Sequence, residues 1–270
     1  MNAPLPQVIT PALTIAQQTQ VINLVRRAAK AEILPRFRNL STGSISQKTN
    51  ANDLVTDADL EAEAMITRGL LRLFPSATVV GEEAISKNPD LREQINDAEL
   101  AFIVDPVDGT ANFVNGLATF GVILSVTRFG TPVFGLHYDP IMDDYLIADT
   151  SDLPTRRVTS NGIARPVATS KARPISEMLG YIHFHIMPKE DQTRMAPLLP
   201  DFRIITALRC SCHEYRTLTQ GGVDFALSGI LNPWDHAAGV LLTEKAGGYV
   251  RMLDGTPYTT KATTGYLLAA

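Results

Sequence analysis

The stretch FIVDPVDGTANF, residues 102–113, joins a predicted strand to a pair of acidic side chains. Its first three residues are apolar and two of them are β-branched, which favours a buried strand. Asp105 and Asp108 follow, three residues apart, around a proline and before a glycine. Two neighbouring carboxylates repel each other, and burial adds to that cost unless a cation neutralises them. The stretch therefore predicts a strand that ends at a cation site.

Further acids stand at similar places along the chain. Glu82 and Glu83 follow a short β-branched strand in ATVVGEE (77–83), and Asp235 stands in the first turn of a helix predicted from NPWDHAAG (232–239). In layered α/β proteins, ligands collect at the carboxyl ends of strands. Each acid also has an ordinary explanation: a helix cap for Asp235, a turn for DPVDG, and a solvated pair for the two glutamates.

Taken together, these acids favour a site for divalent metal ions. Clustered carboxylates without neighbouring Lys or Arg are costly unless a cation is present, and their oxygens suit Mg²⁺, Mn²⁺ or Ca²⁺ rather than zinc. Their spacing is not that of an EF-hand loop. Two aspartates on one turn suit a pair of ions bridged by one carboxylate, which is typical of phosphoryl transfer.

The residues after Asp108 predict a phosphate site beside the metals. Gly109 lets the backbone approach a ligand closely, and GTANF (109–113) is expected to open a helix whose first amides point at an anion. Thr110 adds a hydroxyl that can bind a metal or orient a water. We therefore expect backbone N–H groups and metal ions to hold a phosphate together.

The rest of the chain predicts mixed helices and strands. A helix is expected over 14–33, with Thr14 and Gln17 as a capping box and Pro35 at its end, and a second helix is expected over 57–73. Further expected elements are a loop or hairpin at 41–53, an antiparallel meander at 121–130, 132–140 and 143–150, a strand at 181–186, and helices near 210–219 and 235–245. This mixture favours an α/β or α+β layered fold.

Composition excludes several classes of protein. The chain has 270 residues, of which 45% are hydrophobic, enough for one large domain or two packed halves. The formal net charge is −4 and no basic block occurs, so we expect no nucleic-acid partner. Residues 1–14 do not resemble a secretory signal, and no apolar run approaches the roughly 20 residues of a membrane span. Cys210 and Cys212 are expected to be small core residues in a reducing cytoplasm.

The sequence resembles the inositol monophosphatase family of metal-dependent phosphatases. The resemblance rests on motifs in order along most of the chain: KTNANDLVTDAD (48–59), GEE (81–83), DPVDGTANF (105–113), and WDHAAG (234–239) followed by TEKAGG (243–248). It implies a five-layered α-β-α-β-α sandwich of the inositol monophosphatase and fructose-1,6-bisphosphatase type, usually a homodimer. One domain would span 1–270, with most metal ligands in about 1–150 and Asp235 and the substrate-pocket helix in about 151–270.

The resemblance also implies which residues bind metal. Glu82, Asp105 and the backbone carbonyl of Val107 would hold one Mg²⁺. Asp105, Asp108 and Asp235 would hold a second, with two or three ions in each active site and Mn²⁺ as a possible substitute. The family's sensitivity to Li⁺ would follow from competition at a Mg²⁺ position.

Residues around the metals would act on water. By the same resemblance, Glu83 and Thr110 would position or activate the attacking water, with Asp59 beside them. Lys48 and Asp53 would lie in the mobile loop of the metal site. Asp53 and Asp59 can also be ordinary acids at the start of a helix. His236, next to the metal-binding aspartate on a helix, is expected to point elsewhere and to be structural.

The implied substrate contacts differ from the family pattern in several places. These contacts are Asp108, Gly109, Thr110, Ala111, Arg209 and Ser228. Ala111 stands where the family usually has a second threonine, and Ser228 stands where inositol-specific members have a glutamate that contacts the sugar alcohol. LRCSCHEY (208–215) replaces a run of small residues and brings Arg209, His213 and Glu214. Arg209 could bind a second anionic group or could pair with an acid.

We therefore expect a Mg²⁺-dependent phosphomonoesterase that activates water and hydrolyses a small phosphorylated metabolite, in first place one like inositol 1-phosphate. Histidinol phosphate, a nucleoside 3′,5′-bisphosphate and a sugar bisphosphate are alternatives. A different class of function is a regulator that binds RNA or a protein through the same fold. The complete set of acids favours the enzyme, because a binding module has no use for it.

Overall fold

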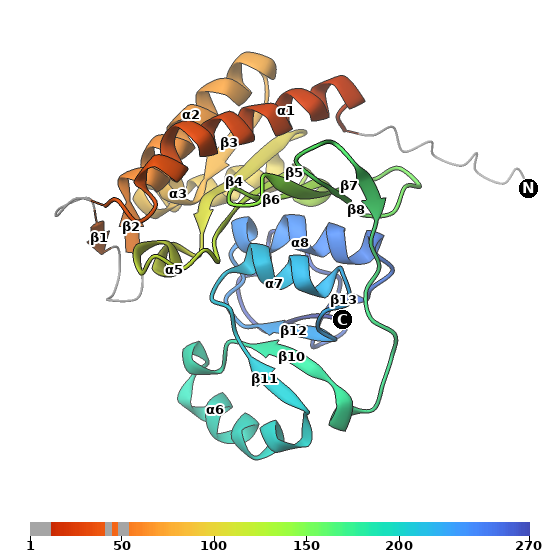
Figure 1. Ribbon diagram of the computed structural model, residues 1–270. Helices are drawn as coiled ribbons and strands as arrows, with labels where there is room; N and C mark the ends of the chain where they lie inside the picture. The colour runs from red at the N-terminus through yellow and green to blue at the C-terminus, as the bar shows by residue number, and fades with distance from the viewer. Residues whose placement is uncertain (1–11, 41–44, 48–53) are drawn as a thin grey trace, which may run out of the picture.

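Five alternating layers of helix and sheet make up the protein, as the computed structural model shows for residues 12–40, 45–47 and 54–270 (Figure 1). Helices α1 (Ile15–Ala28) and α2 (Asp57–Leu73) cover the outer face of a seven-stranded sheet. Helices α7 (Ser211–Leu218) and α8 (Pro233–Lys245) lie between this sheet and a five-stranded sheet. Helix α6 (Lys189–Met195) lies outside the second sheet. The predicted five-layered sandwich is confirmed.

The large sheet contains the predicted meander. Its order is β3-β4-β5-β6-β7-β8-β9, and β3 and β4 are its parallel pair, while the other neighbours are antiparallel. The strands are β3 (Thr78–Gly81), β4 (Ala101–Asp108), β5 (Gly121–Arg128), β6 (Thr131–Asp139), β7 (Asp144–Asp149), β8 (Arg156–Val158) and β9 (Ala164–Pro166). Every residue of β4 is buried, as its continuous apolar start predicts.

The small sheet is formed by the C-terminal part of the chain. Its order is β11-β10-β12-β14-β13. The strands are β10 (Leu179–Ile182), β11 (Ile204–Thr206), β12 (Phe225–Ser228), β13 (Val250–Met252) and β14 (Leu267–Ala269). Strand β10 is parallel to both of its neighbours, and β14 is antiparallel to β12 and β13.

The strand predicted over 181–186 is wrong in its second half. Strand β10 ends at Ile182, and a 3₁₀ turn, η4 (Phe184–Ile186), follows. His183 at the junction has ψ 55°, far from the extended conformation, and its ring bonds to Glu214 on α7. This tertiary contact turns the chain and overrides the alternating pattern of the sequence.

The two N-terminal helices start at the predicted residues, and each has a capping box, of which only the first was predicted. Thr14 and Gln17 form the box of α1, and Thr56 and Asp59 form that of α2. Helix α1 continues through a π turn (Ala29–Ile33) into a 3₁₀ turn (Leu34–Arg36) that contains the predicted proline stop.

The remaining elements are short. They are the hairpin β1 (Ile45–Gln47) and β2 (Leu54–Thr56), helices α3 (Glu82–Lys87), α4 (Leu91–Asp97) and α5 (Thr110–Val114), and 3₁₀ turns η3 (Ile175–Glu177) and η5 (Ala196–Asp201). In the described part of the chain, no helix combines the length and the apolarity that crossing a membrane would require. Cys210 and Cys212 are both buried and free, as predicted.

The two middle-layer helices pack closely at Gly239 of α8. A Cβ atom added there would lie 2.3 Å from Cδ2 of Tyr215 on α7. Tyr215 is 4% exposed, so its ring has little room to move away. The small residue in the predicted AAG run therefore sets the distance between α7 and α8.

Replacing Gly239 should push these helices apart. We expect Gly239→Val to lower the free energy of unfolding by about 1–3 kcal/mol or more through overpacking, although valine favours a helix more than glycine does. Urea unfolding followed by circular dichroism measures the loss. Glu244→Val, on the exposed part of the same helix, is the control; equal losses in both variants would contradict the close contact.

Candidate active site

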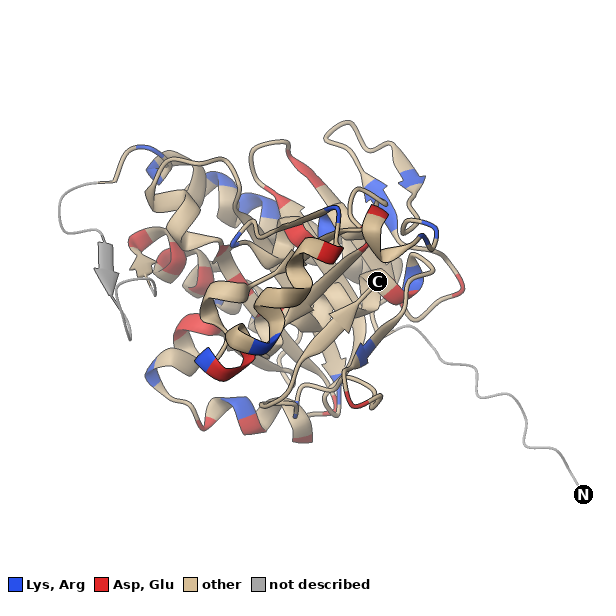
Figure 2. Cartoon of the chain, turned by 90° about the horizontal axis from the view of Figure 1, so that it is seen from below, with Lys and Arg blue, Asp and Glu red and all other residues tan. Residues whose placement is uncertain are grey.

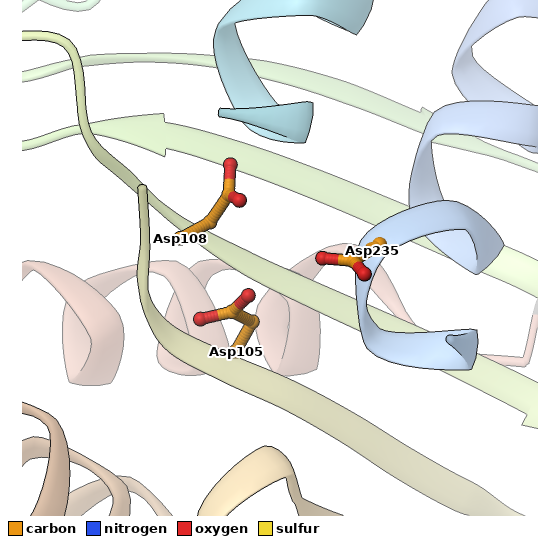
Figure 3. A group of neighbouring side chains, drawn as sticks. All are labelled: Asp105, Asp108 and Asp235. Carbon is orange, nitrogen blue, oxygen red and sulfur yellow. The ribbon is translucent and has the colours of Figure 1, made fainter. Parts of the chain in front are cut away.

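Three aspartates from two layers meet at one point. Asp105 and Asp108 end strand β4, and Asp235 lies in the first turn of α8. Figure 3 shows their side chains projecting into a common space, and one carboxylate oxygen from each lies within 4.8 Å of the others. Asp105 is 2% exposed and Asp108 is 7% exposed. Among the described residues, none of the three forms an ion pair with Lys or Arg.

Burial and mutual repulsion make it costly for these three carboxyl groups to be ionised without a cation. Burial raises the pKa of Asp105 well above its ordinary value, and the charges of Glu82, Asp108 and Asp235 raise it further. The pKa of Asp235 is raised in the same way, first by burial and then by Asp108 and Glu82. Burial raises the pKa of Asp108 to about 6, against the lowering effect of its hydrogen bonds. Hard oxygen donors in this state fit divalent ions such as Mg²⁺.

A bulge at the end of β4 explains how both of its aspartates reach the site. Asp105 pairs with Ile123 and Asp108 with Gly121, so β4 carries one residue more than β5 between these pairs. Residues three apart on a regular strand point to opposite faces, and the extra residue brings both carboxylates to the same face. Inside the bulge, the amide of Val107 donates to Oδ1 of Asp105 at 3.1 Å.

The middle layer holds Asp108 in place. The backbone N–H of Cys212 donates to its Oδ2 at 2.5 Å, and Sγ of Cys210 donates to the same oxygen at 3.0 Å. These contacts join the start of α7 to the end of β4. The cysteines were predicted only as core residues, and the contact of Cys210 with a site carboxylate was not foreseen.

The predicted glutamates directly follow the neighbouring strand, β3. Strands β3 and β4 are parallel, so Glu82 and Glu83, which follow β3, come to the same edge of the sheet as the aspartates. Glu63 of α2 accepts hydrogen bonds from the backbone N–H of Glu83 at 2.8 Å and of Ala84 at 3.0 Å. This buried glutamate fixes the first turn of α3. The sequence carries no signal for this contact, because both partners are backbone groups about twenty residues away.

Asp59 caps α2 and also contacts Thr110. Its Oδ2 accepts from the backbone N–H of Thr56 at 2.8 Å and from the Thr56 hydroxyl at 2.6 Å, as a residue of a capping box does. Its Oδ1 lies 3.2 Å from the hydroxyl of Thr110, which also lies 3.0 Å from the carbonyl of Val107. Asp59 therefore links the start of α2 to the loop after β4. Lys48 and Asp53 lie outside the described residues.

A cavity of about 260 Å³ opens over the acids. Seven of the predicted site residues line it: Glu82, Asp108, Gly109, Thr110, Ala111, Arg209 and Asp235. Gly109 has φ 88°, in the left-handed region, and a Cβ atom there would lie 2.9 Å from the carbonyl oxygen of Thr119. The chain needs glycine at this position both for its conformation and for space.

Arg209 and Ser228, the two predicted specificity residues, differ in their surroundings. Arg209 is exposed and has φ 56°, and its guanidinium has no hydrogen-bond or ion-pair partner within the described ranges. Ser228 is buried at the end of β12, and its hydroxyl donates to the carbonyl of Ile230 at 3.2 Å. Ile230, rather than Ser228, is among the residues around the cavity.

Two histidines that sequence reasoning did not assign to the site also line the cavity: His183 and His185. Nε2 of His183 lies 2.9 and 2.8 Å from the two carboxylate oxygens of Glu214. In the sequence, His183 and His185 alternate with apolar residues, a pattern that predicted a strand and did not indicate the contact between His183 and Glu214.

His236 is structural, as predicted. Its Nε2 donates to the carbonyl of Ile230 at 2.6 Å, and its Nδ1 accepts from the Tyr215 hydroxyl at 3.0 Å. Burial lowers its pKa to about 4, which agrees with a neutral ring between these partners.

Comparison with known proteins agrees with this arrangement. The sequence model of the inositol monophosphatase family matches residues 13–270. The chain belongs to this family. It is 29% identical over 220 residues to an inositol-1-monophosphatase of Bacillus subtilis, covering 80% of this chain and 78% of the relative.

Other relatives show the range of the family. The chain is 27% identical over 252 residues to a Nus factor SuhB of Vibrio cholerae, covering 88% of this chain and 87% of the relative. Its fold matches an IMPase of Thermotoga maritima with a TM-score of 0.77 at 22% identity, over 95% of this chain and 92% of the other. The fold is therefore that of the family, and its members carry more than one kind of name.

Removing one charge from the cluster should stabilise the metal-free protein. A carboxyl group whose pKa is raised by folding contributes stability below its unfolded pKa and loses it as the pH rises through the folded value. We expect wild type in EDTA to lose stability relative to Asp105→Asn as the pH is raised above the ordinary range of a carboxyl group.

Chemical unfolding of both proteins at several pH values measures this difference, in which the titrating groups outside the cluster cancel. Asp97→Asn, on the exposed end of α4, should follow wild type. In Mg²⁺, wild type should become more stable than Asp105→Asn, because the ion stabilises wild type more. A wild type more stable than Asp105→Asn throughout, without metal, would rule out dominant repulsion.

Proposed function

We propose that the protein is a Mg²⁺-dependent phosphomonoesterase that hydrolyses a small phosphorylated metabolite. The observation that carries this proposal is the group of three aspartates beneath the cavity, with one ligand oxygen from each within 4.8 Å of the others. Buried carboxylates in this number are stable only when protonated or when paired with cations. Of these two states, the one paired with cations supports hydrolysis of a phosphate ester at neutral pH.

The chain offers ligands for two ions. Glu82, Asp105 and the carbonyl of Val107 would hold one, and Asp105, Asp108 and Asp235 would hold the other, with Mn²⁺ as a substitute. Bound ions supply positive charge for the carboxylates and the phosphate and make a water molecule more acidic. The positions of these residues support the proposal, because Asp105, Val107 and Asp108 lie on β4, Glu82 begins α3 and Asp235 lies in the first turn of α8.

The other residues position the reactants. The Thr110 hydroxyl, beside Asp59, and the Glu83 carboxylate, fixed through its own backbone N–H, would orient the attacking water. The backbone amides of Gly109 and Thr110 would hold the phosphate. The close approach that Gly109 permits supports this assignment, because a side chain there would meet Thr119.

Activity should depend on divalent metal. We expect EDTA to abolish hydrolysis of generic phosphomonoesters, and Mg²⁺ or Mn²⁺ to restore it, because carboxylates in this cluster repel each other and the phosphate until they are neutralised. Asp105→Asn should lower kcat by at least about two orders of magnitude in saturating Mg²⁺. Full activity in EDTA would contradict the metal-dependent proposal. Inhibition by Li⁺ tests only the family-level expectation.

The substrate is proposed more narrowly from the cavity wall. A metabolite like inositol 1-phosphate stands first, in keeping with the name of the Bacillus subtilis relative. The guanidinium of Arg209, which has no partner among the described residues, also favours a substrate with a second anionic group, such as a nucleoside 3′,5′-bisphosphate or a sugar bisphosphate. It disfavours histidinol phosphate, whose amino group is cationic.

Arg209 should discriminate between substrates. If it binds a second anion by charge-assisted hydrogen bonds worth about 1.5–3 kcal/mol, Arg209→Ala should lower kcat/KM roughly 10–150-fold for that substrate. Turnover of p-nitrophenyl phosphate should barely change, because it has no second anion. A panel of phosphorylated metabolites measures both, with Arg203→Ala, another exposed arginine, as the control. Equal losses on all substrates would mean that Arg209 supports the fold or the metal site.

A regulator that binds RNA or protein is the second candidate function. The Vibrio cholerae relative named as a Nus factor gives this alternative its support. The distribution of charge does not support a regulator that binds RNA, since acidic and basic segments are interspersed over the described part of the chain (Figure 2). Absence of phosphatase activity with Mg²⁺ across a broad panel, together with binding of RNA or protein, would favour it.

The proposal includes a homodimer in the cytoplasm. The family resemblance suggests the dimer, which sedimentation equilibrium of the purified protein tests. The two free, buried cysteines agree with a reducing compartment.

A further inference from the structure

The side chains of the cavity wall fall into two chemical groups. Glu82, Asp108 and Asp235 are the acids, where the metals and phosphate would be. His183, His185 and Arg209 are basic; the two histidines lie at the start of turn η4 and within it, and Arg209 lies in the loop before α7. A phosphate ester held at the acids would extend its alcohol part into the remaining space, and the basic side chains are then available to contact it.

His183 is held in a fixed orientation by Glu214. Its Nε2 lies within 2.9 Å of both carboxylate oxygens, and Glu214 also accepts from the backbone N–H of Leu208 at 2.7 Å. Glu214 is 4% exposed, so the carboxylate is buried among these partners. Nδ1 of His183 has no hydrogen-bond partner in the described chain and is not among the fully buried polar atoms that lack one, and His183 lines the cavity. Nδ1 is the ring nitrogen that remains for a ligand.

The neighbouring charges favour a protonated ring. Burial lowers the pKa of His183, but the hydrogen bond and charge of Glu214 and the charge of Asp108 outweigh this effect, and the net pKa is raised. The pKa of His185 is lowered by burial and by the charges of His183 and Arg209. Burial and the charge of His183 lower the pKa of His236 to about 4, so the His236 ring is neutral.

The other proton donors of the cavity are less suitable. The guanidinium of Arg209 keeps its protons at any ordinary pH. Burial raises the pKa of the Cys210 thiol well above its usual value, and the thiol already donates to Asp108. The orientation and charge of His183 distinguish it from both groups.

We propose that His183, oriented by Glu214, donates the proton on Nδ1 to the leaving oxygen of the substrate. This inference rests on the proposed phosphatase function. As the water oxygen bonds to phosphorus, the ester P–O bond breaks, and the ester oxygen takes its electron pair and the Nδ1 proton to leave as an alcohol. The phosphate carries both protons of the water until one of them returns through solvent to His183. Glu214 accepts from Nε2–H throughout.

The more basic the leaving group is, the more its departure depends on receiving a proton. An alkoxide is a poor leaving group without a proton, whereas p-nitrophenolate is stable as an anion. We expect His183→Gln to lower kcat/KM for an alkyl phosphate such as glycerol 2-phosphate by about 10²-fold or more. The value for p-nitrophenyl phosphate should remain close to that of wild type. A series of substituted phenyl phosphates should show a steeper dependence on leaving-group pKa in the variant.

The pH profile separates proton donation from a merely structural effect. Wild type should lose activity on the alkyl ester as the pH rises through the pKa of His183, and this alkaline limb should vanish in His183→Gln. Glu214→Gln should move the limb to lower pH, because it removes the charge that favours the imidazolium. His185→Gln, on the same wall, should leave the ratio of the two ester activities unchanged.

The outcomes distinguish this inference from the function on which it rests. If wild type hydrolyses neither ester with Mg²⁺, the proposed function fails. If wild type hydrolyses both, and His183→Gln lowers both equally, proton donation by His183 is overturned and the phosphatase remains. Should the variants fail to fold by circular dichroism, the wild-type profile still decides: an alkyl-ester rate with no alkaline limb overturns the inference.

Discussion

Repulsion among buried carboxylates is the constraint on which this structure depends. Asp105, Asp108 and Asp235 come from a strand and from a helix more than a hundred residues away, and burial makes their charges costly. Without rigid supports, such side chains would turn away from each other. The layered fold prevents this, because α8 lies directly on the sheet that ends at the site. The cost remains in the metal-free state and is offset when cations enter.

Supports for the acids come from every neighbouring element. The bulge in β4 turns two aspartates to one face, the start of α7 holds Asp108, and Glu63 of α2 holds the first turn of α3. Few of these supports are themselves proposed ligands. They are mostly backbone N–H groups and buried side chains, and they hold the carboxylates without neutralising them. A Lys or Arg in their place would fix the geometry but compete with the metal.

The sequence predicts most of this fold where the signal is local. The capping box of Thr14 and Gln17 places the start of α1, apolar runs split by Gly, Pro and Asp place the meander, and the acids after β3 and β4 predict a metal site. The sequence fails where a distant contact decides the local structure. His183 leaves its strand to reach Glu214, thirty-one residues away. The same holds for Glu63, whose partners are backbone groups twenty residues away and carry no sequence signal.

The pair of His183 and Glu214 also affects the charge near the acid cluster. Glu214 is near enough to raise the pKa of both Asp108 and Asp235, so its negative charge adds to the repulsion. Both of its oxygens bond to the imidazole of His183. A positive charge on this ring offsets the charge of Glu214 beside the acids. The chain can therefore carry a glutamate in LRCSCHEY, where the family resemblance implies small residues, because the histidine that follows β10 accompanies it.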